Sequence, residues 1–353
     1  MNASPPGPIF IVGAARSGTE LVRGMLNRHL EIHLATETHY FDDLRPRLGS
    51  RAVSGLEGKE RTLAIDYFRG LRHRAYGLSG DPELSDWSAE LLDDAARSLG
   101  SGGDALFAAY CQLSAAEAGK VIWGEKTPRH VFRVEEMLEA FPTARIIVVL
   151  RDVRGVVASY RDWRNRWFDT ESLLPEMKRA VIAEEARAAA SYSLTLIALL
   201  WCSAVRTAAR WYKRYGSDRV IFLRFEDVLL NPEDGARLLA SQVGVPFDRA
   251  MLDAAIVNSS YVGSHTKLGF DAAVADRWRD NLSHAERRHI DLIAGCTLSN
   301  LGYERDNLGI SVRHSGWELV TFGVAVLRAL IFNRARIANP LRYLQIRMAG
   351  LIS

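Results

Sequence analysis

Four short apolar runs, each followed by a helix-like segment, constrain the fold of this chain more than any other feature. They are residues 8–13 (PIFIVG), 120–126 (KVIWGEK), 144–152 (ARIIVVLRD) and 218–227 (DRVIFLRFED), and each is rich in β-branched residues. Such runs, separated by helices, are typical of buried strands in a parallel sheet with helices on both faces. Ligands of these sheets bind beyond the carboxyl ends of the strands. The sequence therefore predicts an α/β fold of the phosphate-loop type, with functional residues directly after these runs.

The segment after the first run predicts an anion-binding loop. Residues 13–20 read GAARSGTE and lead into the amphipathic segment LVRGMLNRH, so a strand, a tight turn and a helix follow one another. Such a loop directs backbone N–H groups and the positive end of a helix dipole at one point, where a phosphate or sulfate can bind. We expect Arg16, Ser17, Gly18 and Thr19 to form this site. A glycine-containing turn without a ligand is the alternative for the loop taken alone.

Two residues distinguish this loop from the phosphate loop of nucleoside triphosphate enzymes. In the pattern GxxxxGK[ST], the lysine neutralises phosphate charge and the hydroxyl binds Mg²⁺. Here Thr19 occupies the lysine position and Glu20 the hydroxyl position. The chain lacks the groups that a kinase uses at the β and γ phosphates, so a less charged donor fits better. A phosphate-loop kinase with strict Mg²⁺ dependence is kept as the alternative.

With these motifs the chain resembles the sulfotransferase family that uses 3′-phosphoadenosine 5′-phosphosulfate (PAPS). The resemblance is strongest to protein-tyrosine and bacterial members whose donor loop reads PRSGTT, where this chain has ARSGTE. Five further segments follow in the family's order: TETHYF, WGEKTPR, VVLRDVRGVVASY, FLRFEDVLLNP and RWRDNLS. The resemblance spans residues 8–302, apart from 44–119. It implies a sulfotransferase with PAPS as donor, a hydroxyl acceptor and no metal.

The resemblance also implies a second anion site, in the segment RDVRGVVAS. Arg151 directly follows the apolar residues IIVVL of the third run, and Ser159 lies eight residues further on, in the helix expected next. In the family this pair resembles the binding site for the donor's 3′-phosphate, and an arginine fork beside a hydroxyl suits a phosphate chemically. ATP carries no 3′-phosphate, so this pair is the main indication of PAPS, with Arg154 as an assisting residue. The alternative is an ordinary ion pair between Arg151 and Asp152.

Sulfuryl transfer needs a base for the acceptor proton and cations for the charge on the moving group and the leaving phosphate. The resemblance implies that Glu37 is the base, with His39 as the second candidate, and we expect burial to raise the pKa of Glu37. It further implies that Lys126 contacts the transferred sulfate or its bridging oxygen and that Arg16 supports the 5′-phosphate. Solvated strand-end side chains are the alternative for Glu37 and Lys126.

The chain departs from the family pattern at two positions. Glu20 replaces a threonine that would donate to the 5′-phosphate, so either its carboxylate turns towards Arg23 or donor affinity falls. Phe225 replaces a frequent tyrosine, which removes one hydroxyl near the site. Arg277 and Trp278, in RWRDNLS, resemble a stretch that folds over the nucleotide, so we expect them to contact the donor.

The domain organisation is predicted as a sulfotransferase domain, residues 1–312, followed by a C-terminal tail, residues 313–353. Residues 44–119 are expected to form a helical insertion or a cap over the acceptor. The tail is helical, amphipathic and basic, without an acid after its apolar run at 317–332. Such a helix suits a membrane surface, and packing on the protein body or on a second subunit is the alternative. The uncharged stretch 188–205 predicts a buried core helix rather than a membrane span.

The net charge and the cysteine positions limit the classes of partner and the cellular compartments that we expect for this protein. The formal net charge of +3 is too small to make nucleic acid a general partner. Cys111, Cys202 and Cys296 lie far apart without CxxC spacing, which argues against a zinc site and a disulfide framework. Because the N-terminus also lacks signal-peptide features, we expect a cytoplasmic protein, peripheral on a membrane where the tail binds one. The acceptor is open among sugars, lipids, peptides and small alcohols, and a non-catalytic nucleotide-binding protein at a membrane surface is the third hypothesis.

Overall fold

The fold is built on one parallel sheet. A computed structural model describes residues 6–74, 80–163, 175–254, 270–306, 312–334, 337 and 339–352. Its five strands lie in the order β2-β3-β1-β4-β5, and every neighbouring pair is parallel. The four predicted runs are confirmed as strands, and a fifth strand of only four residues adds one edge. The strands are β1 (Ile9–Gly13), β2 (Ile32–Ala35), β3 (Ile122–Lys126), β4 (Arg145–Leu150) and β5 (Val220–Arg224).

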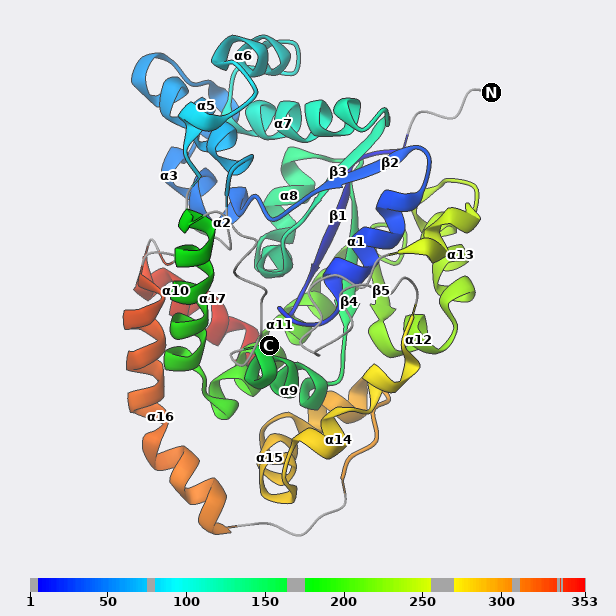
Figure 1. The fold of residues 1–353 in the computed structure, drawn as a ribbon, viewed down its shortest axis with the longest axis vertical. Coiled ribbons are helices and arrows are strands. Elements are labelled where there is room, and N and C mark those ends of the chain that lie inside the picture. The colour runs from blue at the N-terminus through cyan, green and yellow to red at the C-terminus, as the bar shows by residue number, and fades with distance from the viewer. Residues whose placement is uncertain are drawn as a thin grey trace.

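Helices surround this sheet and extend from it at both ends of the molecule (Figure 1). The described α-helices and 3-10 helices (η) are α1 (Thr19–Arg28), α2 (Tyr40–Asp43), α3 (Arg45–Leu48), α4 (Arg51–Ser54), α5 (Gly58–Leu71), η1 (Pro82–Leu84), α6 (Ala89–Arg97), α7 (Gly103–Glu117), η2 (Pro128–Arg133), α8 (Val134–Ala140), α9 (Val153–Trp163), α10 (Pro175–Ser191), α11 (Leu194–Tyr215), α12 (Phe225–Leu230), α13 (Pro232–Val243), η3 (Arg249–Asp253), η4 (Ala272–Ala275), α14 (Trp278–Asn281), α15 (His284–Asn300), α16 (Val312–Phe332) and α17 (Pro340–Ile352).

Both faces of the sheet are buried, as its continuous apolar strands require. Successive side chains of a strand point to opposite faces, so Ile9 and Ile11 of β1 join one core cluster while Phe10 and Val12 join the other. Helices α1, α12 and α13 contribute to the first cluster, and α7, α8, α9, α11 and α15 to the second. The prediction of a parallel sheet with helices on both faces is confirmed.

The described residues between 45 and 117 form the helices α3 to α7 and η1, as the sequence predicts for a helical insertion, and an aromatic cluster joins them to the sheet. The ring of Tyr40 stacks on Phe107 with centroids 5.0 Å apart, and Phe68 lies 5.5 Å from Tyr40. Phe107 in turn lies 6.1 Å from Phe10 of β1. These contacts hold α5 and α7 against one face of the sheet. A role of this segment as an acceptor cap stays a prediction.

The C-terminal helix α17 packs on the protein body. For this helix of the tail, the structure thus shows the alternative to membrane binding that the sequence left open. Ser203 of α11 donates to the carbonyl of Arg347 at 2.6 Å, and Arg206 donates to the carbonyl of Leu351 at 2.5 Å. A Cβ at Gly350 would lie 2.3 Å from the Ser203 hydroxyl, so the two helices are in close contact. The basic residue Arg336 of the tail lies outside the described residues.

Helix α16 lies beside α10 and keeps an apolar surface exposed (Figure 1). Trp317, Val320, Val324, Leu327 and Ile331 are between 49 % and 80 % exposed and recur at helical spacing. Nothing in the structure shows what covers them, so association of this helix with a membrane stays a prediction.

The predicted core helix at 188–205 is broken into two helices. Helix α10 ends at Ser191, and α11 begins after Ser193, whose hydroxyl accepts from the backbone of Leu196 at 3.3 Å. Among the described residues no single helix is long and apolar enough to cross a bilayer. By length and composition alone, the pair formed by Ile182–Ser191 and α11, bent by 92°, passes that test.

Candidate active site

The register of the sheet places the predicted site residues at one edge. Ile11 of β1 pairs with Lys126, the last residue of β3, and Ala35 at the end of β2 pairs with Glu125. Glu37 follows β2 by two residues, so it emerges beside Lys126. Gly13 pairs with Val149 of β4, which brings the loop after β1 beside the residues that follow β4.

The loop between β1 and α1 has the shape of an anion cradle. Arg16 and Gly18 adopt left-handed backbone conformations, with φ of 70° and 89°. Gly18 is the N-cap of α1, so the cap residue has no side chain to bond the first N–H groups of the helix. The hydroxyl of Ser17 is fully buried and has no hydrogen-bond partner among the described residues. A buried hydroxyl beside an uncapped helix N-terminus fits a phosphate or sulfate.

Only glycine fits at position 18, and this gives a testable stability difference. A Cβ there would lie 2.1 Å from the ring of Phe225, whereas a Cβ at Gly244, which is also left-handed, would have only an ordinary contact at 3.7 Å. Both Gly→Ala variants carry the cost of a left-handed backbone, about 1–2 kcal/mol. We expect Gly18→Ala to lose about 1–3 kcal/mol more than Gly244→Ala, because it also overpacks a buried ring. Urea unfolding measures both, and equal losses would contradict the cradle geometry.

The two anion sites expected from the sequence touch each other. Arg16 Nε donates to Ser159 Oγ at 3.1 Å, and Arg151 Nη1 donates to the carbonyl of Arg16 at 3.0 Å. Arg151 and Ser159 are 5 % and 4 % exposed. The guanidinium carbon of Arg151 lies 4.6 Å from the centroid of the Phe225 ring. Phe225 therefore packs on both anion-binding segments.

A buried hydrogen-bond network, which sequence reasoning missed, positions Arg151. Trp201 Nε1 donates to the Arg151 carbonyl at 2.9 Å, and the backbone N–H of Asp152 donates to Glu226 at 2.9 Å. The other oxygen of Glu226 accepts from the Tyr303 hydroxyl at 2.8 Å. Burial raises the pKa of Glu226, and these donors oppose that effect. The signal available in the sequence was the position of this acid near the end of the fourth predicted run, in LRFED.

Glu37 and Lys126 form an ion pair, and Glu20 joins it. Lys126 Nζ lies 2.6 Å from Glu37 Oε1 and 3.2 Å from Glu20 Oε2. Glu20 also accepts from Arg23 Nε at 2.9 Å, so its carboxylate does turn towards Arg23, one of the two predicted outcomes. His39, the second candidate base, places Nε2 3.3 Å from Glu37 Oε2.

The pKa of Glu37 is shifted in the direction opposite to the one expected. Burial acts to raise it, but the Lys126 ammonium and His39 hold the pKa of Glu37 well below its usual range. Burial also acts against the charge of Lys126, yet Glu37 and Glu20 raise the pKa of this ammonium. Burial and the nearby Arg129 lower the pKa of His39. Near neutral pH, Glu37 is therefore a carboxylate and Lys126 a cation.

A second buried carboxylate, Glu125, fixes the backbone next to Glu37. It is fully buried and accepts from the N–H and the hydroxyl of Thr38 at 2.9 and 3.0 Å. Thr127 also donates to it, and His130 lies 3.3 Å from its other oxygen. Sequence reasoning missed this role, although the acid precedes Lys126 in GEKTP. Glu125 acts as a positioning residue for the strand ends that carry Glu37 and Lys126.

Three other predicted residues are engaged within the protein. Arg154 forms a buried ion pair with Asp152 at 2.7 Å, whereas the alternative interpretation of the sequence paired Asp152 with Arg151. The ring of Trp278 is 2 % exposed and lies 4.0 Å from the Arg154 guanidinium. Arg277 pairs with Asp271. Contacts of Arg277 and Trp278 with the donor stay predictions.

Metal ligation is not indicated in the described part of the chain, where no group of three or more His, Cys, Asp or Glu residues could hold an ion. The predicted absence of a metal cofactor stays a prediction.

The chain is similar to known proteins in both sequence and fold. Residues 8–249 match the model of a family described as the sulfotransferase family. A protein-tyrosine sulfotransferase of Drosophila melanogaster is 23 % identical over 248 residues, which are 69 % of this chain and 39 % of that relative's length. The sulfotransferase domain from the Synechococcus PCC 7002 olefin synthase shares the fold, with a TM-score of 0.51 and 18 % identity over 87 % of this chain and 98 % of that domain. Since the family match spans well over half of its residues, the chain belongs to the sulfotransferase family.

Proposed function

We propose that the protein transfers a sulfuryl group from PAPS to a hydroxyl group of a glycan, glycolipid or other small molecule. One observation carries the proposal: the loop after β1 and the Arg16, Arg151 and Ser159 cluster adjoin the Glu37–Lys126 pair at one edge of the sheet. Anion-binding groups and a candidate base therefore converge where an α/β sheet binds its ligands.

The anion-binding groups suit the two charged ends of PAPS. The Ser17 hydroxyl and the uncapped N-terminus of α1 would hold the 5′-phosphate, with Arg16 beside it. Arg151 and Ser159 would hold the 3′-phosphate through an arginine fork and a hydroxyl. The 3′-phosphate is absent from ATP, so this second site would select the donor.

The chemistry that we propose is an in-line displacement at sulfur. Glu37 accepts the acceptor proton as the acceptor oxygen bonds to sulfur and the bond from sulfur to the 5′-phosphate oxygen breaks. Lys126 stabilises the negative charge that develops on that leaving oxygen. An anionic donor beside Lys126 competes with Glu37 for the ammonium, which increases the basicity of Glu37 in the reacting complex. The products are a sulfated acceptor and adenosine 3′,5′-bisphosphate (PAP).

The exposed apolar residues of α16 would suit binding to a membrane surface, and a protein at that surface would meet a lipid-linked acceptor. The proposal also includes a cytoplasmic location, because the three cysteines are far apart and show no CxxC spacing, as expected in a reducing compartment.

Calorimetry with PAP and with ATP, each with Mg²⁺ and with EDTA, tests this function. We expect PAP to bind at least about 100-fold more tightly than ATP, since only PAP offers a 3′-phosphate to Arg151, and we expect Mg²⁺ to have no effect. Tighter binding of ATP in the presence of Mg²⁺ would contradict the proposal and favour the kinase. Labelled PAPS with a panel of alcohols then measures transfer directly.

A further inference from the structure

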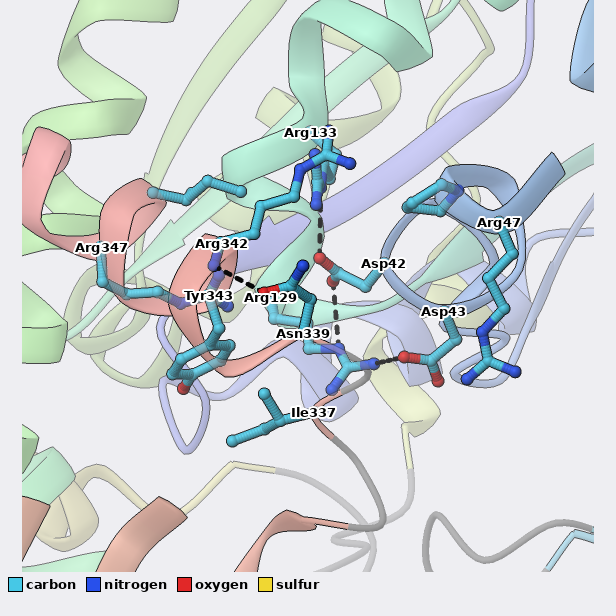
Figure 2. A pocket seen from close by; sticks show the side chains of 12 residues that line it. Asp42, Asp43, Arg47, Arg129, Arg133, Ile337, Asn339, Arg342, Tyr343 and Arg347 are labelled. Carbon is cyan, nitrogen blue, oxygen red and sulfur yellow. Dashed lines mark hydrogen bonds and ion pairs between the residues drawn. The ribbon is translucent and has the colours of Figure 1, made fainter. Parts of the chain in front are cut away.

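A basic cavity of about 360 Å³ lies between α2, η2 and α17, next to the candidate site (Figure 2). Five arginines and two aspartates contribute to its lining, together with apolar and neutral polar groups. The charged lining residues are Arg47, Arg129, Arg133, Arg342, Arg347, Asp42 and Asp43.

The two acids of this cavity are already engaged by arginines. Asp42 lies 3.0 Å from Arg129 Nε and 3.3 Å from Arg133 Nε, and Asp43 lies 2.5 Å from Arg129 Nη2. Figure 2 shows these pairs side by side on one wall. Burial acts to raise the pKa of Asp42, but the surrounding arginines lower it, so it is ionised. Asp42 also acts electrostatically on Arg347 of α17, but its carboxylate is shared with Arg129 and Arg133.

Arg347, on the opposite wall, is the unusual residue. It is 7 % exposed, and its guanidinium carbon lies 4.0 Å and 4.2 Å from the ring centroids of Tyr343 and Phe132. Its guanidinium has no hydrogen bond or ion pair within the part of the chain that the structure describes, and its Nε is completely buried. A buried cation that makes no ion pair of its own is costly unless a ligand supplies one. The two rings fix the guanidinium plane, and its edge is available to a ligand in the cavity.

The cavity adjoins the reacting groups. Helix α2 begins three residues after Glu37, and Arg129 follows Lys126 by three residues. Arg129 lies near enough to His39, the neighbour of Glu37, to lower its pKa. The two phosphates of the donor are assigned to the loop after β1 and to Arg151. This cavity is therefore available to the acceptor.

We propose that this cavity binds an anionic group of the acceptor, a phosphate, sulfate or carboxylate, and that Arg347 pairs with it. A planar guanidinium held between two rings binds two oxygens of such a group at once. The acceptor is then an anionic alcohol, such as a sugar phosphate or a phospholipid headgroup. This assignment rests on the proposed function, because it treats the cavity as the acceptor side of that site.

The test measures the binding of a second anion to the protein when its donor site is saturated with PAP. PAP fills the donor site first, so a failure of PAP to bind counts against the proposed function and not against this cavity. Inorganic phosphate is then titrated into the PAP complex of the wild-type protein and of Arg347→Met, which keeps the packing between the rings. Arg237→Met, at an exposed arginine of α13, removes the same charge elsewhere.

We expect phosphate to bind the wild-type PAP complex, and its affinity to fall at least about tenfold in Arg347→Met while Arg237→Met binds normally. Arg347→Lys should restore part of the affinity, because it returns the charge without the fork. Circular dichroism confirms that each variant is folded. The assignment is overturned if the wild-type complex binds no phosphate, or if Arg347→Met binds it as tightly as the wild type.

Two further probes, each added to the PAP complex, distinguish a soluble anionic acceptor from a lipid headgroup. One is glycerol 3-phosphate in solution, and the other is vesicles of phosphatidylglycerol. Binding of either probe that Arg347→Met weakens supports the cavity and identifies a soluble or a lipid acceptor. Binding of neither, or binding that Arg347→Met leaves unchanged, overturns it.

Discussion

Glu37→Gln is expected to lower kcat for sulfuryl transfer by about 10²- to 10⁴-fold, the usual contribution of a positioned general base. Glutamine keeps the size of the side chain but cannot accept the acceptor proton. PAP should bind this variant at least as tightly as the wild type, because Glu37 pairs with Lys126 and its neutral replacement no longer competes with the nucleotide for that ammonium. Transfer of label from PAPS and calorimetry with PAP measure the two quantities.

The control for this variant lies at the other end of the same strand. Glu31→Gln changes an exposed glutamate directly before β2 and should leave kcat unchanged. Unchanged turnover in Glu37→Gln would remove Glu37 from the mechanism.

The pH profile gives a second test of Glu37. Its pKa in the free protein lies well below the ordinary value of 4.5, because Lys126 and His39 favour the carboxylate. Glu37 is therefore ionised across neutral pH, and kcat/KM for PAPS, which reports on the free protein, should fall only as the pH drops through that lowered pKa, below 4.5. An acid limb between pH 6 and 7, in a protein that circular dichroism shows to be folded, would contradict this assignment.

Arg151→Ala is expected to weaken PAP binding by about 100-fold, or about 2.7 kcal/mol, since it removes a buried arginine fork from a phosphate. The loss should be specific to the 3′-phosphate. Adenosine 5′-monophosphate, which lacks this group, should therefore bind the variant and the wild type within a few-fold of each other. Calorimetry with both nucleotides measures the difference.

Two further variants separate the role in binding from the role in folding. Arg151→Lys keeps the charge without the fork and should lose less affinity. Arg237→Ala removes an exposed arginine and should bind PAP normally. Equal losses of PAP and of the monophosphate in Arg151→Ala would show that the variant distorts the loop, because Arg151 also donates to the Arg16 carbonyl.

The sheet and the donor loop were predictable because their signals are local. A buried parallel strand shows itself as a continuous apolar run, and the glycine positions of the loop mark the tight turn before a helix. The residues at the ends of those runs, Lys126 and Arg151, were therefore placed correctly at the edge of the sheet. Strand β2 was too short to be predicted by the same criterion, with only four residues.

The pairing of side chains was not predictable, because it depends on the sheet register. Glu37 and Lys126 are 89 residues apart in the chain and meet only because β2 and β3 are neighbours. That contact reverses the expected direction of the Glu37 pKa shift. The surroundings of Arg347 were not predictable for the same reason. In the sequence it belongs to a basic tail, but in the structure it is buried against two aromatic rings.

In this account, residues at one edge of the sheet bind both the 5′-phosphate and the 3′-phosphate of the sulfated adenosine nucleotide. A crystal structure with PAP bound tests it most directly. The account predicts the 5′-phosphate against Ser17 and the N-terminus of α1, and the 3′-phosphate within hydrogen-bond distance of Arg151 and Ser159. A structure in which either phosphate lies away from these groups would contradict it.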